Sequence, residues 1–259
     1  MVVPDGGTGK DAPTYNGRTG GRFAAEWLLG ALAGLPPGIG APAALGAFSG
    51  APASCGHRRG GHNPANPPDA TMGVYSAVRR EGWRFDDINL RLGAVCPEPP
   101  AQPTDAITTA FRAALLEAYL AGGASQESLM ADDPSWSALL PLLARQGVFA
   151  NLPAPHPLGY GVVNAAIVLA HHRQVYLVPA GTEVVLASDG YLSAEGELAQ
   201  SEAVLADVLA ADLLLIRRYQ GFRPAHAGGS FDDRCWVRFT TDVVAAVEST
   251  GLPLRAVGR

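Results

Sequence analysis

The chain has 259 residues and a formal net charge of −5, with 47% hydrophobic and 17% charged residues. This length supplies one large or two small domains with a sizeable core, and mild acidity argues against a nucleic-acid-binding protein that works through its net field. No 18-residue apolar run, signal-peptide pattern or CxxC pair occurs, so we expect a cytoplasmic globular protein with no membrane and no nucleic-acid partner.

The first third of the chain predicts one helix, one long loop and a group of strands. Apolar residues such as Phe23 and Trp27 recur at helical spacing over about 18–34. Residues 36–69 are rich in glycine, proline and alanine, and we interpret them as a long loop within the domain. Residues 71–92 predict two or three strands joined by tight turns.

The middle of the chain predicts two helical stretches. The stronger covers about 104–121, where a stripe that includes Phe111 and Tyr119 recurs every four residues and is expected to face the core. Thr104 is its expected N-cap. A second helical stretch, over about 125–146, is broken by one proline.

From about residue 160 the pattern becomes rich in strands. Short apolar runs predict strands at 161–169, 174–178, 183–187 and 234–239. Helices are expected near 198–210 and 241–249. Because blocks of helices and blocks of strands do not alternate regularly, the order predicts an α+β layered fold, in which 1–259 form one domain.

Aspartates at turns are the residues that suggest chemistry. Asp5 precedes Gly6, Asp189 precedes a glycine directly after a predicted strand, and Asp232 and Asp233 directly precede another strand. Carboxylates are the oxygen ligands that Mg²⁺ and Mn²⁺ take, and a following glycine lets a peptide carbonyl approach as a further ligand. Two cations about 3.5–4 Å apart can lower the pKa of a bridging water and clamp a phosphoryl oxygen. Any one of these turns alone is most simply explained as a turn.

In their order along the chain, these turns resemble those of the metal-dependent protein phosphatases of the PP2C (PPM) family. The best match is Ala187-Ser188-Asp189-Gly190, and residues 74–87 look like a middle-strand segment of that family. The resemblance implies a four-layer αββα sandwich of two packed mixed or antiparallel sheets flanked by helices. It also implies hydrolysis of phosphoserine or phosphothreonine in a phosphorylated protein, or of a small phosphomonoester, by a metal-activated water without a phosphoenzyme.

The same resemblance implies a ligand set for two Mg²⁺ or Mn²⁺ ions. Asp5 would bridge both ions, and the Gly6 carbonyl would bind one of them. Asp189 and Asp232 would complete the shell. Because the aspartate is doubled, Asp233 is the alternative to Asp232.

Several departures from the family pattern keep other functions open. The strands and the phosphate-binding arginine that family members carry before the first Asp-Gly are missing, so the chain looks N-terminally truncated. Gly7 stands where many eukaryotic members have histidine, Asp86-Asp87 replaces a Gly-Asp, and Cys235 replaces a threonine. One alternative is therefore a non-catalytic PP2C-like regulatory or binding domain. Another is an unrelated α+β protein in which the aspartates only make turns.

Other candidate motifs are weaker. Gly6–Lys10 departs from the P-loop pattern. Cys55, His57 and His62 lack a fourth partner nearby and are interpreted as part of a polar loop. His171-His172 is interpreted as a surface pair, because neighbours on a strand point to opposite faces.

Overall fold

The structure is a computed structural model of the whole chain. It describes residues 1–7, 14–15, 17–48, 67–100, 102–153, 156–164, 166–225 and 230–242. No helix among these residues has the length and apolar character needed to span a bilayer.

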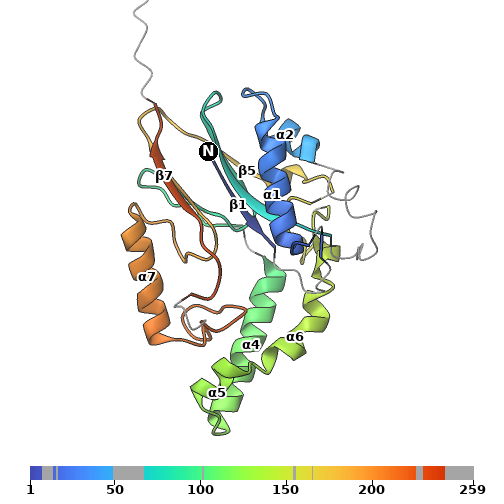
Figure 1. Cartoon of the computed structure of the whole chain (residues 1–259), viewed down its shortest axis with the longest axis vertical. Coiled ribbons are helices and arrows are strands. Elements are labelled where there is room, and N and C mark those ends of the chain that lie inside the picture. Colours follow the sequence, from blue (N-terminus) through green and yellow to red (C-terminus); the bar gives the residue numbers. More distant parts are fainter. Residues whose placement is uncertain are drawn as a thin grey trace, which may run out of the picture.

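Two antiparallel sheets form the centre of the described structure (Figure 1). The first has the order β1 (Val2–Gly6), β2 (Ala70–Ser76), β3 (Glu81–Phe85) and β5 (Gln174–Leu177). The second has the order β4 (Asn89–Leu92), β6 (Glu183–Ala187) and β7 (Trp236–Thr240). These strands confirm the predicted strand blocks, apart from 161–169, where Val163 makes only an isolated bridge to Ala70.

Strand β1 is the part of the sheet that the sequence pattern indicated least. It pairs with β2 so that Asp5 lies opposite Thr71, and Val3 is fully buried. Helix α1 (Gly20–Ala33) passes close to it, because a Cβ atom on Gly6 would lie 2.4 Å from the backbone of Gly21. Glycine at both positions therefore lets the helix rest on the strand that carries Asp5.

Helices α1 and α2 (Ala41–Phe48) cover the outer face of the first sheet. Their buried side chains Leu28 and Phe48 pack in one cluster with Met72 and Phe85 of the sheet. Helix α2 corrects the interpretation of 36–69 as one long loop: apolar residues fill its buried face, namely Ala41, Ala44, Leu45 and Phe48. Residues 49–66 lie outside the described part.

The two sheets pack face to face. Val3 and Tyr75 of the first sheet share a buried cluster with Val184 and Leu186 of the second, and Ile88 lies in the same cluster. The described layers are therefore helices, first sheet and second sheet. The helix expected at 241–249 lies outside the described residues, apart from its first two.

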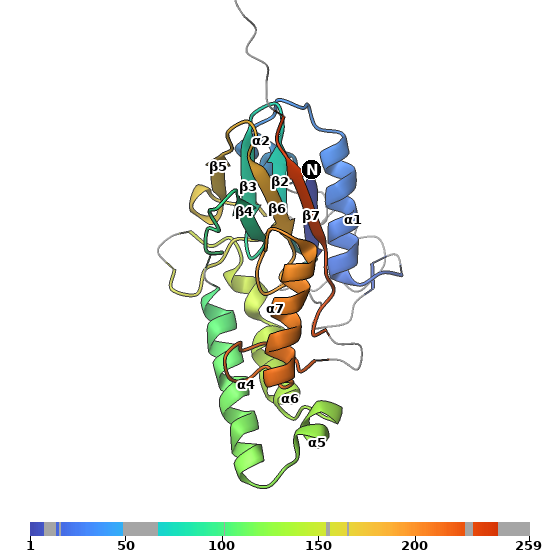
Figure 2. The same ribbon diagram turned by 90° about the vertical axis from the view of Figure 1, so that its left-hand side faces the viewer.

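The remaining helices lie at one end of the sheets (Figure 2). They are α4 (Pro103–Ala121), α5 (Gln126–Ala131), α6 (Ser135–Leu143) and α7 (Leu198–Ala211). Two short 3₁₀ helices, η1 (Gln146–Phe149) and η2 (Ala170–His172), connect segments between them. The predicted break near residue 134 is confirmed by the gap between α5 and α6.

The orientation predicted for α4 is wrong. Phe111 and Tyr119 are 48% and 44% exposed, whereas the buried face carries Thr108, Arg112 and Leu116. The helix packs on α6 and on the chain around Leu214, and the buried cluster that the described residues form there does not include Phe111 or Tyr119. Its N-cap is Gln102 rather than Thr104, which lies inside the first turn.

Candidate functional site

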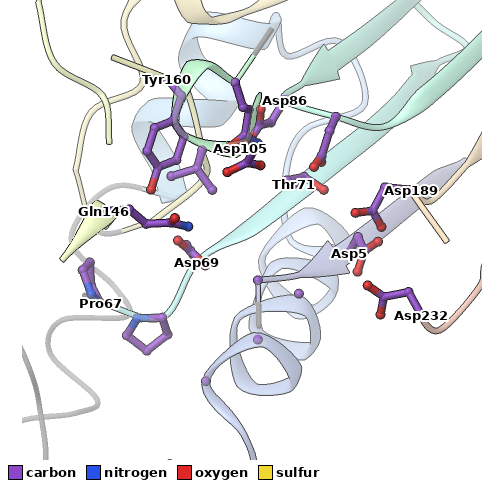
Figure 3. Close-up of a pocket in the computed structure, with 18 of the residues that line it drawn as sticks. Asp5, Pro67, Asp69, Thr71, Asp86, Asp105, Gln146, Tyr160, Asp189 and Asp232 are labelled. Carbon is purple, nitrogen blue, oxygen red and sulfur yellow. The ribbon is translucent and has the colours of Figure 1, made fainter. Parts of the chain in front are cut away.

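A cavity of about 140 Å³ lies where the carboxyl-bearing turns of both sheets meet. Its acidic lining residues are Asp5, Asp69, Asp86, Asp87, Asp105, Asp189 and Asp232. Figure 3 shows the side chains of Asp5, Asp189 and Asp232 pointing toward one another. Residues that are far apart in the sequence thus share one pocket.

Sheet packing accounts for this convergence. Asp5 lies in the last part of β1, and Asp189 follows the last residue of β6 by two positions. Because β1 and β6 contact each other across the interface between the sheets, the ends of these strands meet at one edge. Asp232 approaches from the turn before β7, which pairs with β6.

The carboxyls of Asp5 and Asp189 are hydrogen-bonded to each other, and this contact lowers the pKa of Asp5 and raises that of Asp189. The pKa of Asp5 is about 6, raised chiefly by burial and also by the charges of Asp233, Asp87 and Asp232. Burial, followed by the charge of Asp5, also raises the pKa of Asp189 well above its usual range. Both carboxyls are therefore protonated more readily than an isolated aspartate.

Asp87 belongs to the same electrostatic group. Its pKa is raised to about 7, chiefly by burial and also by the charge of Asp189, while a hydrogen bond with Thr71 opposes both effects. Asp86, beside it, is fully buried, and its Oδ2 accepts a hydrogen bond of 2.7 Å from Gln102 Nε2. The pocket thus concentrates negative charge that protons or cations must neutralise.

The structure brings most of the predicted site residues together. Asp5, Gly6, Asp189 and Asp232 all line the cavity, whereas Asp233 is absent from its lining. The Asp233 backbone N–H donates to Asp232 Oδ1 at 2.9 Å, which fixes one carboxyl of the doubled pair relative to the other. Their roles as metal ligands remain predictions.

Sequence reasoning missed Asp87 as a member of the cluster. It was interpreted as a departure from a Gly-Asp motif, although two adjacent acids directly after a buried strand were a usable signal. Asp86 adopts a φ of 72°, and this left-handed conformation turns the chain between β3 and β4. That turn directs both carboxyls to the cavity.

The donor set matches the chemistry of a hard divalent cation, because buried carboxylates and a glycine carbonyl are its preferred ligands. Within the described ranges, no group of three or more His, Cys, Asp or Glu residues is arranged so that it could hold a metal ion as it stands. The hydrogen bond between Asp5 and Asp189 accounts for this, since the two carboxyls are turned onto each other. The donors fit such an ion by their chemical type.

A second cavity of about 290 Å³ adjoins the first, and we call it the side pocket. It shares Asp87, Asp105, Asp189, Phe222 and Asp232 with the acidic cavity. Among the described residues that line the two cavities, Arg223 is the one cation, and its charge opposes the effect of burial on the pKa of Asp232.

The histidine pair lies in a turn, with His171 exposed and His172 half-buried, which agrees with its interpretation as surface or turn histidines. His171 and His172 lie on η2 rather than on a strand, and both line a third cavity together with His156. The tight 3₁₀ turn removes the alternation that a strand would impose. His172 Nε2 lies 3.0 Å from the Leu152 carbonyl oxygen.

Cys96 and Cys235, the cysteines in the described part of the chain, are free thiols and form no disulfide there. Cys55, His57 and His62 lie outside the described residues, as do Thr8–Lys10 of the P-loop-like stretch.

No family model matches the chain, and no curated protein matches it significantly. Among solved structures, it is similar to the Mycobacterium tuberculosis serine/threonine phosphatase PstP/Ppp, with 15% identity, a TM-score of 0.37, and coverage of 80% of this chain and 74% of that one. A stage II sporulation E family protein from Thermanaerovibrio acidaminovorans has 19% identity and a TM-score of 0.32, with 81% and 86% covered. PppA, a regulatory component of T6SS in Pseudomonas aeruginosa, has 16% identity and a TM-score of 0.33, with 81% and 84% covered. These are distant likenesses.

Proposed function

We propose that the chain is a metal-dependent phosphatase of the PP2C type that hydrolyses phosphoserine or phosphothreonine, or a related phosphomonoester. One observation carries the proposal: Asp5 and Asp189 are hydrogen-bonded to each other in a cavity that Asp232 and Asp87 also line. These aspartates come from turns in the order that the family motif prescribes. The two antiparallel sheets and the helices α1 and α2 support the family's four-layer fold for a single domain, 1–259.

The proposed ligands divide between the two sheets. Asp5 and the Gly6 carbonyl belong to the first sheet, while Asp189 and Asp232 flank strands of the second. Two Mg²⁺ or Mn²⁺ ions, when bound, would supply an activated water and neutralise phosphoryl oxygens. Asp5, which lies against Asp189, would be the ligand that the two ions share, as the resemblance implies.

Residues of the chain itself contribute charge to the cavity and shield it from bulk water. Burial of Asp87 and Asp189 takes these carboxyls away from bulk water, which strengthens every electrostatic interaction in the cavity. A phosphomonoester dianion cannot enter a pocket of uncompensated carboxylates, so substrate binding is expected only after these charges are neutralised. Arg223 adds a fixed positive charge at the boundary of the side pocket.

A second candidate function rests on a different observation. In the part of the chain that is described, Asp5 and Asp189 are hydrogen-bonded to each other, and no group of three or more His, Cys, Asp or Glu residues is arranged to hold a metal ion. A PP2C-like domain that has lost catalysis and serves as a regulatory or binding module would retain such a pocket without needing a metal. The third alternative, aspartates that only make turns, does not explain why these carboxyls meet.

The test compares Mn²⁺-dependent hydrolysis of an aryl phosphate by the unmodified protein and by Asp189→Asn. We expect kcat/KM of the variant to fall at least about 100-fold. Loss of a residue that only supports a metal ligand costs about 10–100-fold in affinity or activity, and loss of the ligand itself should cost no less. Asp207→Asn is the matched control, since Asp207 is exposed on α7 and outside both cavities. Unchanged activity in Asp189→Asn would contradict the proposal. Calorimetry that detects no Mn²⁺ binding by a folded protein would favour the regulatory alternative.

A further inference from the structure

The side pocket opens directly from the acidic cavity. Asp87, Asp189 and Asp232 line both, so a group held among these carboxyls lies at the boundary of the side pocket. Phe222 is also shared, and it forms an apolar part of that boundary. The two cavities are therefore adjacent, so different parts of one ligand could occupy both.

Beyond the shared residues, the wall of the side pocket is mainly aromatic and aliphatic. Its apolar members are Pro99, Tyr191, Leu192, Tyr219 and Phe231. The rings of Tyr219 and Phe231 contact each other, with centroids 5.7 Å apart. Such a surface favours burial of an apolar or aromatic group. The volume of about 290 Å³ is at the lower limit for small-molecule ligand pockets and suits a single side chain.

The wall is held in place before any ligand arrives. Arg112, with no exposed side-chain surface, donates from Nη1 to the carbonyl oxygens of Leu214 at 2.8 Å and Gly221 at 3.0 Å. Asp212 Oδ2 accepts from the backbone N–H groups of Ile216 and Arg217 at 2.9 and 2.7 Å. These bonds fix the segment that carries Tyr219 and Phe222, so a ligand pays little ordering entropy there.

We propose that the side pocket binds the residue next to the phosphorylated serine or threonine of a protein substrate, and that it selects a large apolar or aromatic side chain. The inference rests on the proposed function, because the phosphoryl group must lie among Asp5, Asp189 and Asp232. In a peptide bound there, the adjacent side chain meets the opening of the side pocket. The aromatic wall would then contact that side chain. The carboxyls that line both cavities would act on the phosphoryl group through the cations they hold.

The experiment uses phosphoserine peptides that differ only at the two residues flanking phosphoserine, which are both phenylalanine or both alanine. With Mn²⁺ present, we expect kcat/KM to be at least about tenfold higher for the phenylalanine peptide, since occupation of an apolar pocket is worth that factor. Ala106→Phe places a ring in the side pocket from an exposed position on α4, and it should bring the ratio close to one. Ala114→Phe, exposed two turns further along α4 and outside the pocket lining, should keep the ratio.

Binding of the same peptides, labelled and followed by fluorescence anisotropy, separates this inference from the proposed function. In one outcome, the protein hydrolyses neither peptide and still binds the phenylalanine peptide about tenfold more tightly, with this preference lost in Ala106→Phe. That result would support the side pocket as a binding site and exclude the proposed phosphatase activity. Equal affinities and equal kcat/KM values overturn the inference while leaving phosphatase activity intact. A preference confined to 2-phenylethyl phosphate over ethyl phosphate also overturns it, because the pocket would then hold the leaving group itself.

Discussion

Arg223 lines the side pocket and is positioned by an aromatic partner. Its guanidinium carbon is 5.0 Å from the centroid of the Trp136 ring, a cation–π distance. Its charge acts on Asp232, one of the proposed ligands. A positively charged side chain held at this place can attract a phosphoryl dianion toward a pocket whose other charges are all negative.

We therefore predict that Arg223→Gln raises KM for a phosphoserine peptide by about tenfold or more, because a charge-assisted contact contributes about 1.5–3 kcal/mol. The change in kcat should be smaller. Steady-state kinetics with saturating Mn²⁺ measure both constants. Arg217→Gln serves as the control, since that side chain is 66% exposed and paired with Glu117. An unchanged KM in Arg223→Gln would rule out a role in substrate binding.

At the scale of residues, the sequence predicted the acids that stand in recognisable motifs and missed those that do not. Asp5 and Asp189 each precede glycine in a turn, and both reach the cavity. Asp87 and Arg223 lack such a motif. Arg223 enters the site only because bonds from Arg112 and Asp212 hold its segment against α4, a long-range effect that no local pattern encodes.

The contact between α1 and β1 is the element that positions the first proposed ligands. A Cβ atom on Gly21 would lie 2.4 Å from the Gly7 carbonyl oxygen and 2.6 Å from the Gly6 carbonyl carbon. These atoms belong to the backbone and cannot rotate away. The helix would have to move from the strand, and the Gly6 carbonyl would move with it.

Gly21→Ala should consequently lower the free energy of unfolding by about 1–3 kcal/mol, the usual cost of overpacking, and weaken Mn²⁺ binding. Gly30→Ala in the same helix meets nothing within 4 Å and should raise stability by up to about 1 kcal/mol through helix propensity. Urea denaturation and calorimetric titration with Mn²⁺ provide the two measurements. If the two variants have the same free energy of unfolding and the same affinity for Mn²⁺, the close packing of α1 on β1 does not constrain the site.

Element boundaries were more predictable than element orientation. Thr19 caps α1 by accepting from Arg22 N–H, and glycines end α4, so local signals place both helices. The face that α4 buries could not be predicted in the same way. Its buried Arg112 is stabilised by Asp133 and by distant carbonyls, which offsets the preference of Phe111 for the interior.

For the whole molecule, the acidic cavity predicts how stability depends on pH. The pKa values of Asp5 and Asp87 are raised to about 6 and about 7, above the value near 3.9 expected for unfolded aspartate. A group with a raised folded pKa contributes stability that is present below its unfolded pKa and is lost as pH rises through the folded pKa. His172, whose pKa burial lowers, acts in the opposite direction as one partly exposed group.

We expect the thermal midpoint of the metal-free protein, held in a chelator, to fall between pH 5 and pH 8. Added Mn²⁺ should raise the midpoint, and by more at pH 8 than at pH 5, because the ions replace protons on the same carboxyls. Differential scanning fluorimetry across this range measures both effects. A midpoint that rises with pH in the chelator would show that these carboxyls do not repel one another in the folded protein.

The donors of the cavity are divided between two sheets that pack on each other through buried side chains. Val3 on the first sheet and Leu186 on the second, with Ile88 from the turn before β4, determine how far one sheet is offset from its neighbour. A shift of one sheet relative to the other would separate Asp5 from Asp189 and would leave the strand pairing within each sheet intact. The distance between the acidic side chains therefore depends on the size of the apolar side chains packed between the sheets. Neither sheet alone can form the pocket.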